Sequence, residues 1–127
     1  MSGDVSMADV SVGNTEEIAV EDDKMTILPG MASDGSAASF KIKDEDHTLG
    51  NTLRYMIMKN PDVEFCGYSI PHPNDNHMHL RIQTYGEITA IEALQKGLRD
   101  LVDVCDVVEN KFRDEYNKGD YVQEEIA

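Results

Sequence analysis

The feature that most constrains this chain is a run of apolar residues near its C-terminal end, spaced alternately by three and four positions. The run consists of Ile91, Leu94, Leu98, Leu101, Cys105, Val108 and Phe112. This spacing places all of its side chains along one seam of an α-helix, as at the a and d positions of a coiled coil. The pattern predicts one helix from about residue 87 to 116, roughly 45 Å long at about 1.5 Å per residue.

A helix of this length is longer than the rest of the chain can cover. A folded body of about 90 residues is only about 30 Å across. We therefore expect the helix to overhang its own domain and to pack its seam against another protein. Val104 and Val107 lie outside the seam, so a single face does not account for all of its apolar residues. A helix covered entirely by its own domain is the alternative.

Charge divides the chain into a folded part and two acidic ends. Residues 1–23 contain seven acids and no Lys or Arg, and they contain few large apolar residues, a composition typical of disorder. We expect a disordered tail at 1–23, one domain at 24–118 and a short acidic tail at 119–127. These ends carry most of the formal net charge of −14. A solubilising role explains the N-terminal tail, with docking as the alternative.

The remaining composition excludes several classes of function. Residues 38–113 contain twelve acids and nine bases without a basic cluster, so we expect no direct grip on a nucleic-acid backbone. No apolar run reaches about 18 residues, and no signal sequence is evident, which predicts a soluble intracellular chain without a membrane span. Cys66 and Cys105 lie within apolar patterns, and we interpret both as reduced core cysteines.

Upstream of the long helix, the sequence predicts a small sheet of about four strands. The expected strands cover residues 25–28, 39–43, 63–70 and 78–84. Apolar and polar residues alternate in the second and fourth of them, and Pro29-Gly30 ends the first. The apolar parity changes within the third strand, which predicts a β-bulge at Gly67. The third and fourth strands should form a hairpin, with Met78, Leu80 and Ile82 on the buried face. The predicted fold class is therefore α+β.

A short helix is expected between the second and third strands. Asp46 is suited to be its N-cap, and Pro61 should end it near residue 60. Gly50 in its first turn suggests the close approach of another backbone. One face of the helix is apolar, with Leu49, Leu53, Met56 and Ile57. The opposite side carries Asn51, Arg54, Tyr55 and Met58, which we interpret as a second contact surface.

The polar residues do not assemble a recognisable enzyme site. His77 and His79 share a strand face near His72 and Asp75, but no third metal ligand has a suitable spacing. The acids around His47 are better explained as a helix cap that interacts with the helix dipole. Cys66 has no neighbouring base that could activate its thiol. We predict no catalytic residue, no metal site and no cofactor.

Two segments resemble the signature of a known family. Residues Asp46–Arg54 and Gly67–Pro73 are similar to the small α-like subunits of cellular RNA polymerases, relatives of the dimerising amino-terminal domain of the bacterial α subunit. The resemblance extends from about Phe40 to Phe112. Within the family, residues 54–61, 63–68 and 93–98 most resemble the subunit shared by eukaryotic RNA polymerases I and III. The RNA polymerase II paralogue and the archaeal equivalent share the same family signature and remain alternatives.

The resemblance implies a non-catalytic role in assembly. A larger α-like subunit would pair with the long helix along its seam, and the heterodimer would nucleate binding of the two large catalytic subunits. Asn51, Arg54, Tyr55 and Met58 would contact the second-largest subunit. The implied setting is transcription of ribosomal, transfer and 5S RNA in the nucleus, including the nucleolus. A coiled-coil-type adaptor outside any polymerase, and a small metal-dependent enzyme using His72, His77 and His79, are the alternatives from other classes.

Overall fold

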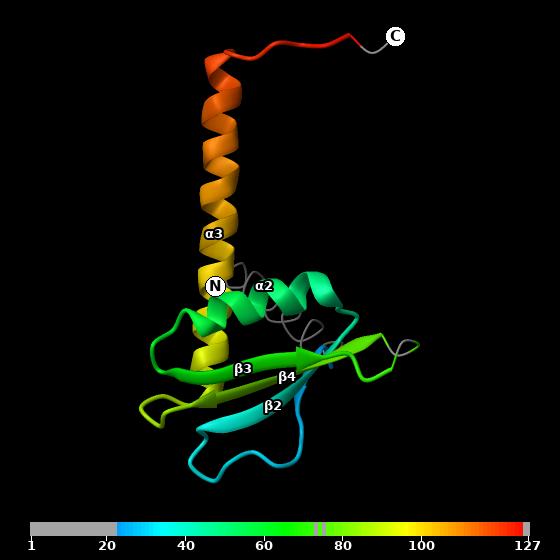
Figure 1. Cartoon of the computed structure of the whole chain (residues 1–127), viewed down its shortest axis with the longest axis vertical. Helices are drawn as coiled ribbons and strands as arrows, with labels where there is room; N and C mark the ends of the chain where they lie inside the picture. Colours follow the sequence, from blue (N-terminus) through cyan, green and yellow to red (C-terminus); the bar gives the residue numbers. More distant parts are fainter. Residues whose placement is uncertain (1–22, 73, 75, 126–127) are drawn as a thin grey trace, which may run out of the picture.

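The computed structural model describes residues 23–72, 74 and 76–125. Figure 1 shows how the strands and helices of this part are arranged. They are β1 (Met25–Ile27), β2 (Ala37–Lys43), α2 (His47–Met58), β3 (Val63–Ser69), β4 (His77–Thr84) and α3 (Ala90–Lys118). The predicted α+β class, with one short helix and one long C-terminal helix, is confirmed. The acidic tail expected at 1–23 lies outside the described residues, apart from Asp23.

The strands form one antiparallel sheet in the order β1-β2-β4-β3. β4 pairs with β2 on one side and with β3 on the other, so the predicted hairpin of the third and fourth strands is confirmed. The alternation in β4 is also confirmed, because Met78, Leu80 and Ile82 are fully buried. α2 and the first turns of α3 lie over this inner face (Figure 1). Within the described residues, no helix covers the outer face.

β3 contains its register irregularity at a different place from the one predicted. The register with β4 shifts between Val63 and Phe65, not at Gly67. Val63 and Cys66 are buried, whereas Phe65 is 47% exposed on the outer face. The prediction was wrong because Phe65 does not share the buried side of the strand with Val63, so the parity already changes before Cys66. The Phe65 ring lies over Gly67 instead, where an added Cβ would be 2.8 Å from its Cζ atom.

α2 begins as predicted, since the Asp46 carboxylate accepts a hydrogen bond from the Thr48 N–H at 2.9 Å. This bond satisfies one of the amide donors that a helix leaves open in its first turn. Leu53 and Ile57 are fully buried against the sheet and α3. The helix therefore presents Leu49, Leu53 and Ile57 of the predicted apolar face to the core.

Gly50 is present because a side chain, not a backbone, approaches α2. A Cβ at Gly50 would be 2.6 Å from the Tyr68 Cε2 atom. The Tyr68 hydroxyl lies 2.7 Å from Nδ1 of His47, and the two rings meet edge to face with centroids 5.6 Å apart. The expectation of a neighbouring backbone is thus corrected: the Tyr68 ring of β3 occupies the space.

α3 confirms the predicted overhang. Thr89, one residue before the helix begins, is its N-cap and forms a capping box with Glu92. Its buried residues, Ala90, Ala93, Leu94 and Gly97, all lie in the first turns. Beyond them the helix projects away from the sheet and from α2 (Figure 1). The alternative that α3 is covered entirely by its own domain is therefore wrong. Gly119, in a left-handed conformation with φ of 67°, ends the helix.

Candidate partner interface

The predicted seam of α3 divides into a part used by the domain itself and a part left in solvent. Leu94 is only 4% exposed and belongs to the core, and Leu98 packs against that core. Ile91 is 37% exposed at the edge of this contact. Leu101 is half-buried beside α2, and beyond it no helix or strand of the described residues covers the seam. The surface available to a second protein therefore begins near Leu101 and not at Ile91, nearly three turns later than the spacing alone indicated at about 3.6 residues per turn.

The overhanging part of α3 presents an apolar stripe. Val108 and Phe112 are 62% and 70% exposed, and Cys105 is exposed between them and Leu101. Other apolar side chains of the overhang widen the stripe or flank it: Val102, Val104, Val107 and Tyr116. The sequence indicated that the helix carries more apolar residues than one face can hold. It did not show which of them would be left uncovered.

α2 and α3 enclose a groove where the overhang begins. The groove has a volume of about 650 Å³ and is mostly apolar. Its lining residues are Asn51, Thr52, Arg54, Tyr55, Met56, Lys59, Leu101 and Val104. The structure thus brings three of the four residues predicted on the polar side of α2 together with the seam of α3. Met58, the fourth, is 43% exposed but does not line the groove. Met56, expected in the core, lines the groove instead.

The rim of this groove is positively charged. The ammonium group of Lys59 lies 4.6 Å from the centroid of the Tyr55 ring, at a distance where a cation–π interaction is favourable. Arg54 is exposed and has no ion-pair partner among the residues that the structure describes. Its planar guanidinium can bind a carboxylate through two parallel hydrogen bonds. The groove therefore suits a partner segment that presents an apolar side chain beside an acidic one.

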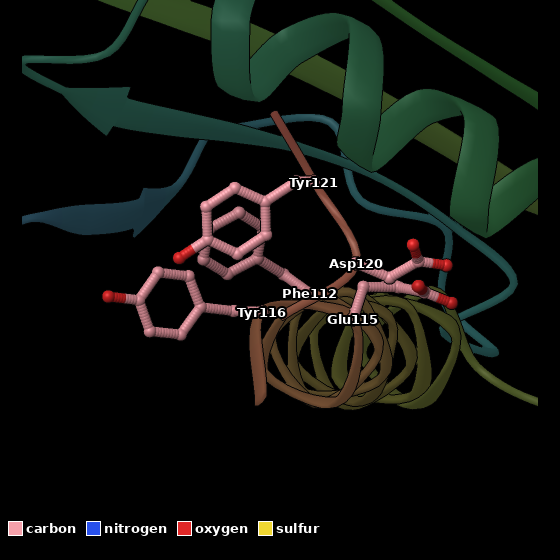
Figure 2. A pocket seen from close by; sticks show the side chains of 5 residues that line it. All are labelled: Phe112, Glu115, Tyr116, Asp120 and Tyr121. Atoms are coloured by element: carbon pink, nitrogen blue, oxygen red, sulfur yellow. The ribbon is translucent and has the colours of Figure 1, made fainter. Parts of the chain in front are cut away.

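A stack of aromatic rings continues the stripe to the end of α3 (Figure 2). The ring centroids of Phe112 and Tyr116 are 6.2 Å apart, and those of Tyr116 and Tyr121 are 5.7 Å apart. Gly119 turns the chain so that Tyr121 returns to the rings, while Glu115 and Asp120 lie at the side of the stack. The three rings extend the apolar surface of the helix, a feature that the heptad spacing did not indicate beyond Phe112.

The two cysteines lie in different environments. Cys66 is buried in the core, and this burial raises the pKa of its thiol to about 12, against a smaller opposing effect of Arg54. Cys105 is exposed on the overhang. The prediction of two core cysteines is therefore confirmed for Cys66 and wrong for Cys105, because the apolar pattern around Cys105 belongs to the stripe.

The predicted polar face of β4 points away from the helices. The rings of His77 and His79 have centroids 5.1 Å apart. Partial burial, together with the charges of His77 and Lys41, lowers the pKa of His79. In the described ranges, no group of three or more His, Cys, Asp or Glu residues is arranged to hold a metal ion. No described helix is both long and apolar enough to cross a bilayer.

Family comparison agrees with this arrangement. A family model described as the RNA polymerase Rpb3/Rpb11 dimerisation domain matches residues 37–111, more than half of the chain. The chain belongs to this family. The match begins with β2 and includes α2 and most of α3, so it contains both helices that line the groove. The stacked rings of Phe112, Tyr116 and Tyr121 lie just beyond it.

Individual relatives are similar over most of the folded part. The DNA-directed RNA polymerases I and III subunit RPAC2 of Saccharomyces cerevisiae is 68% identical over 91 residues, which make up 71% of this chain and 64% of that protein. The subunit of the same description in Schizosaccharomyces pombe is 51% identical over 110 residues, or 87% of this chain and 88% of that protein. The alignment thus spans slightly less than two thirds of the first relative. The resemblance to the subunit shared by RNA polymerases I and III is confirmed.

A solved structure supports the fold. The crystal structure of DNA-directed RNA polymerase subunit L from Thermoplasma acidophilum superposes with a TM-score of 0.63. The superposition covers 78% of this chain and 96% of the archaeal chain, with 18% sequence identity. At this identity the likeness concerns the fold alone, and it confirms the small sheet with one short and one long helix.

Proposed function

We propose that this chain is a non-catalytic scaffold subunit of nuclear RNA polymerases I and III that pairs with the larger α-like subunit. The observation that carries the proposal is the overhanging part of α3, whose apolar stripe is uncovered in a chain of a dimerisation-domain family. Burying a large apolar side chain contributes roughly 1.5–3 kcal/mol. Several such side chains along one helix favour a permanent partner over a transient one.

The larger α-like subunit is the proposed partner of the stripe. Its contact would run along Leu101, Cys105, Val108 and Phe112, with Ile91 and Leu98 at the base of the interface. Leu94 would support the interface from below, because its side chain is already buried in the core. The stacked rings near the end of α3 would extend the contact past the heptad seam.

The groove between α2 and α3 is the proposed site of a second contact, with the second-largest subunit. Asn51, Arg54 and Tyr55 line this groove together with Leu101, and Met58 lies outside it on the same helix. Since the stripe and the groove share Leu101, the two partners would meet there. Pairing with the α-like subunit would then complete the surface that the second-largest subunit recognises, which gives a physical basis for ordered assembly with the two large catalytic subunits.

The assignment to polymerases I and III is supported by the similarity of this chain to relatives that are described as subunits of both enzymes. On this assignment the chain acts in transcription of ribosomal, transfer and 5S RNA, and its place is the nucleus, including the nucleolus. The chain would act in assembly, and the large subunits would catalyse nucleotide transfer.

Affinity purification of the tagged full-length chain, followed by mass spectrometry, tests the proposal. We expect the larger α-like subunit in stoichiometric amount and the large subunits of both polymerases I and III. A chain with Leu101→Asp and Val108→Asp serves as the negative control, because it should not pair and should therefore recover none of these proteins. Recovery of RNA polymerase II subunits alone would transfer the assignment to the paralogue. Partners without any polymerase subunit would contradict the proposal and favour an adaptor.

A further inference from the structure

The outer face of the sheet is basic, although the chain as a whole is strongly acidic. Lys41 and Lys43 of β2 and His77, His79 and Arg81 of β4 occupy outward positions on two adjacent strands. Neither of these strands contains an Asp or a Glu. The five residues are here called the basic face. They lie on the side of the sheet opposite α2 and α3, away from the groove and the stripe.

These cationic and imidazole groups are close to one another. Lys41 lies directly opposite His79, and Lys43 lies opposite His77. Arg81 donates a hydrogen bond to the Ser39 hydroxyl at 3.2 Å. In the described part of the chain, neither lysine forms an ion pair, and Arg81 forms none either. Like charges on adjacent strands repel one another, so an anionic segment placed across them would lower the electrostatic free energy.

The two described acids that directly follow β2 in the chain have partners of their own. Asp44 accepts a hydrogen bond from the Asn76 amide at 3.0 Å. Glu45 forms an ion pair with Lys24 at 2.9 Å. On β3, only Glu64 carries a negative charge. The described residues therefore leave the basic face without an acidic partner of its own.

An acidic segment joins the sheet beside this face. Residues 1–23 contain seven acids and no Lys or Arg, and Glu21, Asp22 and Asp23 directly precede Lys24. The Lys24 carbonyl accepts a hydrogen bond from the Lys43 N–H at 2.8 Å. The acidic run therefore leaves the sheet at the end of the basic face where Lys43 and His77 are paired.

The distances are short enough for this segment to reach every cation of the face. Neighbouring strands are about 4.8 Å apart, and an extended chain advances about 3.3 Å per residue. About five residues are therefore enough to cross from the edge of β1 to β3. The acids Glu16, Glu17, Glu21, Asp22 and Asp23 all lie within eight residues of Lys24.

We propose that the acidic segment Glu16–Asp23 docks on the basic face of its own chain. The contact is electrostatic and within one molecule, and it uses none of the residues assigned to the stripe or the groove. The contact therefore does not depend on the partners proposed for the stripe and the groove. Docking would also keep this face from binding polyanions, because its cations would already be neutralised.

Carbodiimide crosslinking of the full-length chain tests the proposal, since this reagent joins a carboxylate to a lysine amine only where the two touch. We expect links from residues 16–23 to Lys41 and Lys43, and few links to Lys111, an exposed lysine on the overhang. Raising the salt concentration to about 0.5 M should reduce the Lys41 and Lys43 links on the order of tenfold, because surface charges are then screened. Comparable links to Lys111 would overturn the proposal.

Two controls make the result specific. Mixing unlabelled chain with chain labelled with nitrogen-15 distinguishes the two cases, because contacts within one molecule link only peptides of the same isotope. Mixed-isotope links in the statistical proportion expected for contacts between copies would also overturn the proposal. Glu21→Lys with Asp22→Lys should abolish the remaining links from Glu16 and Glu17. Glu124→Lys with Glu125→Lys changes the net charge equally at the other end of the chain and should leave these links unchanged.

Discussion

Gly97 of α3 lies directly against Ile57 of α2, so that a Cβ added to Gly97 would be only 2.5 Å from the Ile57 Cγ1 atom. Ile57 is fully buried, and Gly97 is buried as well. This contact sets how closely the two helices approach. It therefore also fixes the groove between them, whose walls include Tyr55 and Met56 of α2 and Leu101 and Val104 of α3.

Gly97→Ala should destabilise the domain, although alanine is the better helix former. Because the added methyl group overlaps a fully buried side chain, we expect a loss of about 1–3 kcal/mol in the free energy of unfolding. Urea denaturation measures it. Gln95→Ala, at an exposed position of the same helix, should have little effect. In a double-mutant cycle with Ile57→Ala, the two losses should be less than additive. Additive losses would mean that this contact does not limit the packing.

Leu101→Asp combined with Val108→Asp should abolish pairing with the larger α-like subunit and leave the fold intact. The fold should not change, because both residues lie on the overhang. Pairing should be lost, because a partner would bury two unpaired carboxylates at a cost of several kcal/mol. Co-purification from cells that express both subunits measures pairing, and circular dichroism checks the fold. Asn110→Asp, on the opposite side of the helix, should pair normally. Normal pairing of the double variant would remove the stripe from the proposed interface.

Arg54→Ala should leave the heterodimer intact and weaken recruitment of the second-largest subunit. Arg54 is exposed, so its removal should change the free energy of unfolding by no more than about 0.5 kcal/mol. Loss of a charge-assisted, two-point contact should weaken the contact by about 1.5–3 kcal/mol, measured by quantitative pull-down with the purified heterodimer. Arg54→Lys should rescue it only in part, because lysine cannot donate in the same planar geometry. Failure of the heterodimer itself would assign the groove to the α-like partner.

The two thiols should differ in reactivity. Cys105 is exposed, so a maleimide reagent at pH 7 should modify it in the isolated chain. Cys66 should stay unmodified until the domain unfolds, because burial raises the pKa of its thiol to about 12 and hinders access. Addition of the α-like subunit should then slow the labelling of Cys105. Unchanged labelling in the complex would show that the partner does not cover the middle of the stripe.

His79 should make stability depend on pH. Its folded-state pKa is lowered from 6.5 by partial burial and by the charges of His77 and Lys41. The unfolded chain therefore binds a proton more readily than the folded chain, and this contribution to stability is lost as the pH falls through 6.5 toward the lowered value. His79→Gln should flatten the decline in melting temperature between pH 7 and 5. An identical decline in both proteins would contradict the lowered pKa.

Much of the fold follows from local patterns in the sequence. The alternation along β4, the cap at Asp46 and the heptad spacing of α3 each depend on residues near one another in the chain, so periodicity and propensity were sufficient. The predicted length of α3 exceeds the diameter of the folded body, and apolar residues continue along that length. Together these features predicted an uncovered helix that binds a partner. The motifs Asp46–Arg54 and Gly67–Pro73 are by themselves sufficient to indicate the family.

The tertiary structure decided which side of each pattern is used. The sequence could not show that Phe65 faces outward, that the Tyr68 ring fills the space above Gly50, or that Leu94 belongs to the core while Cys105 lies in solvent. It also separated Arg54 and Leu101 into two surfaces, although they line one groove. The physical reason is common to all four. Periodicity assigns a residue to a face of its own helix or strand, but what covers that face depends on segments distant in the sequence.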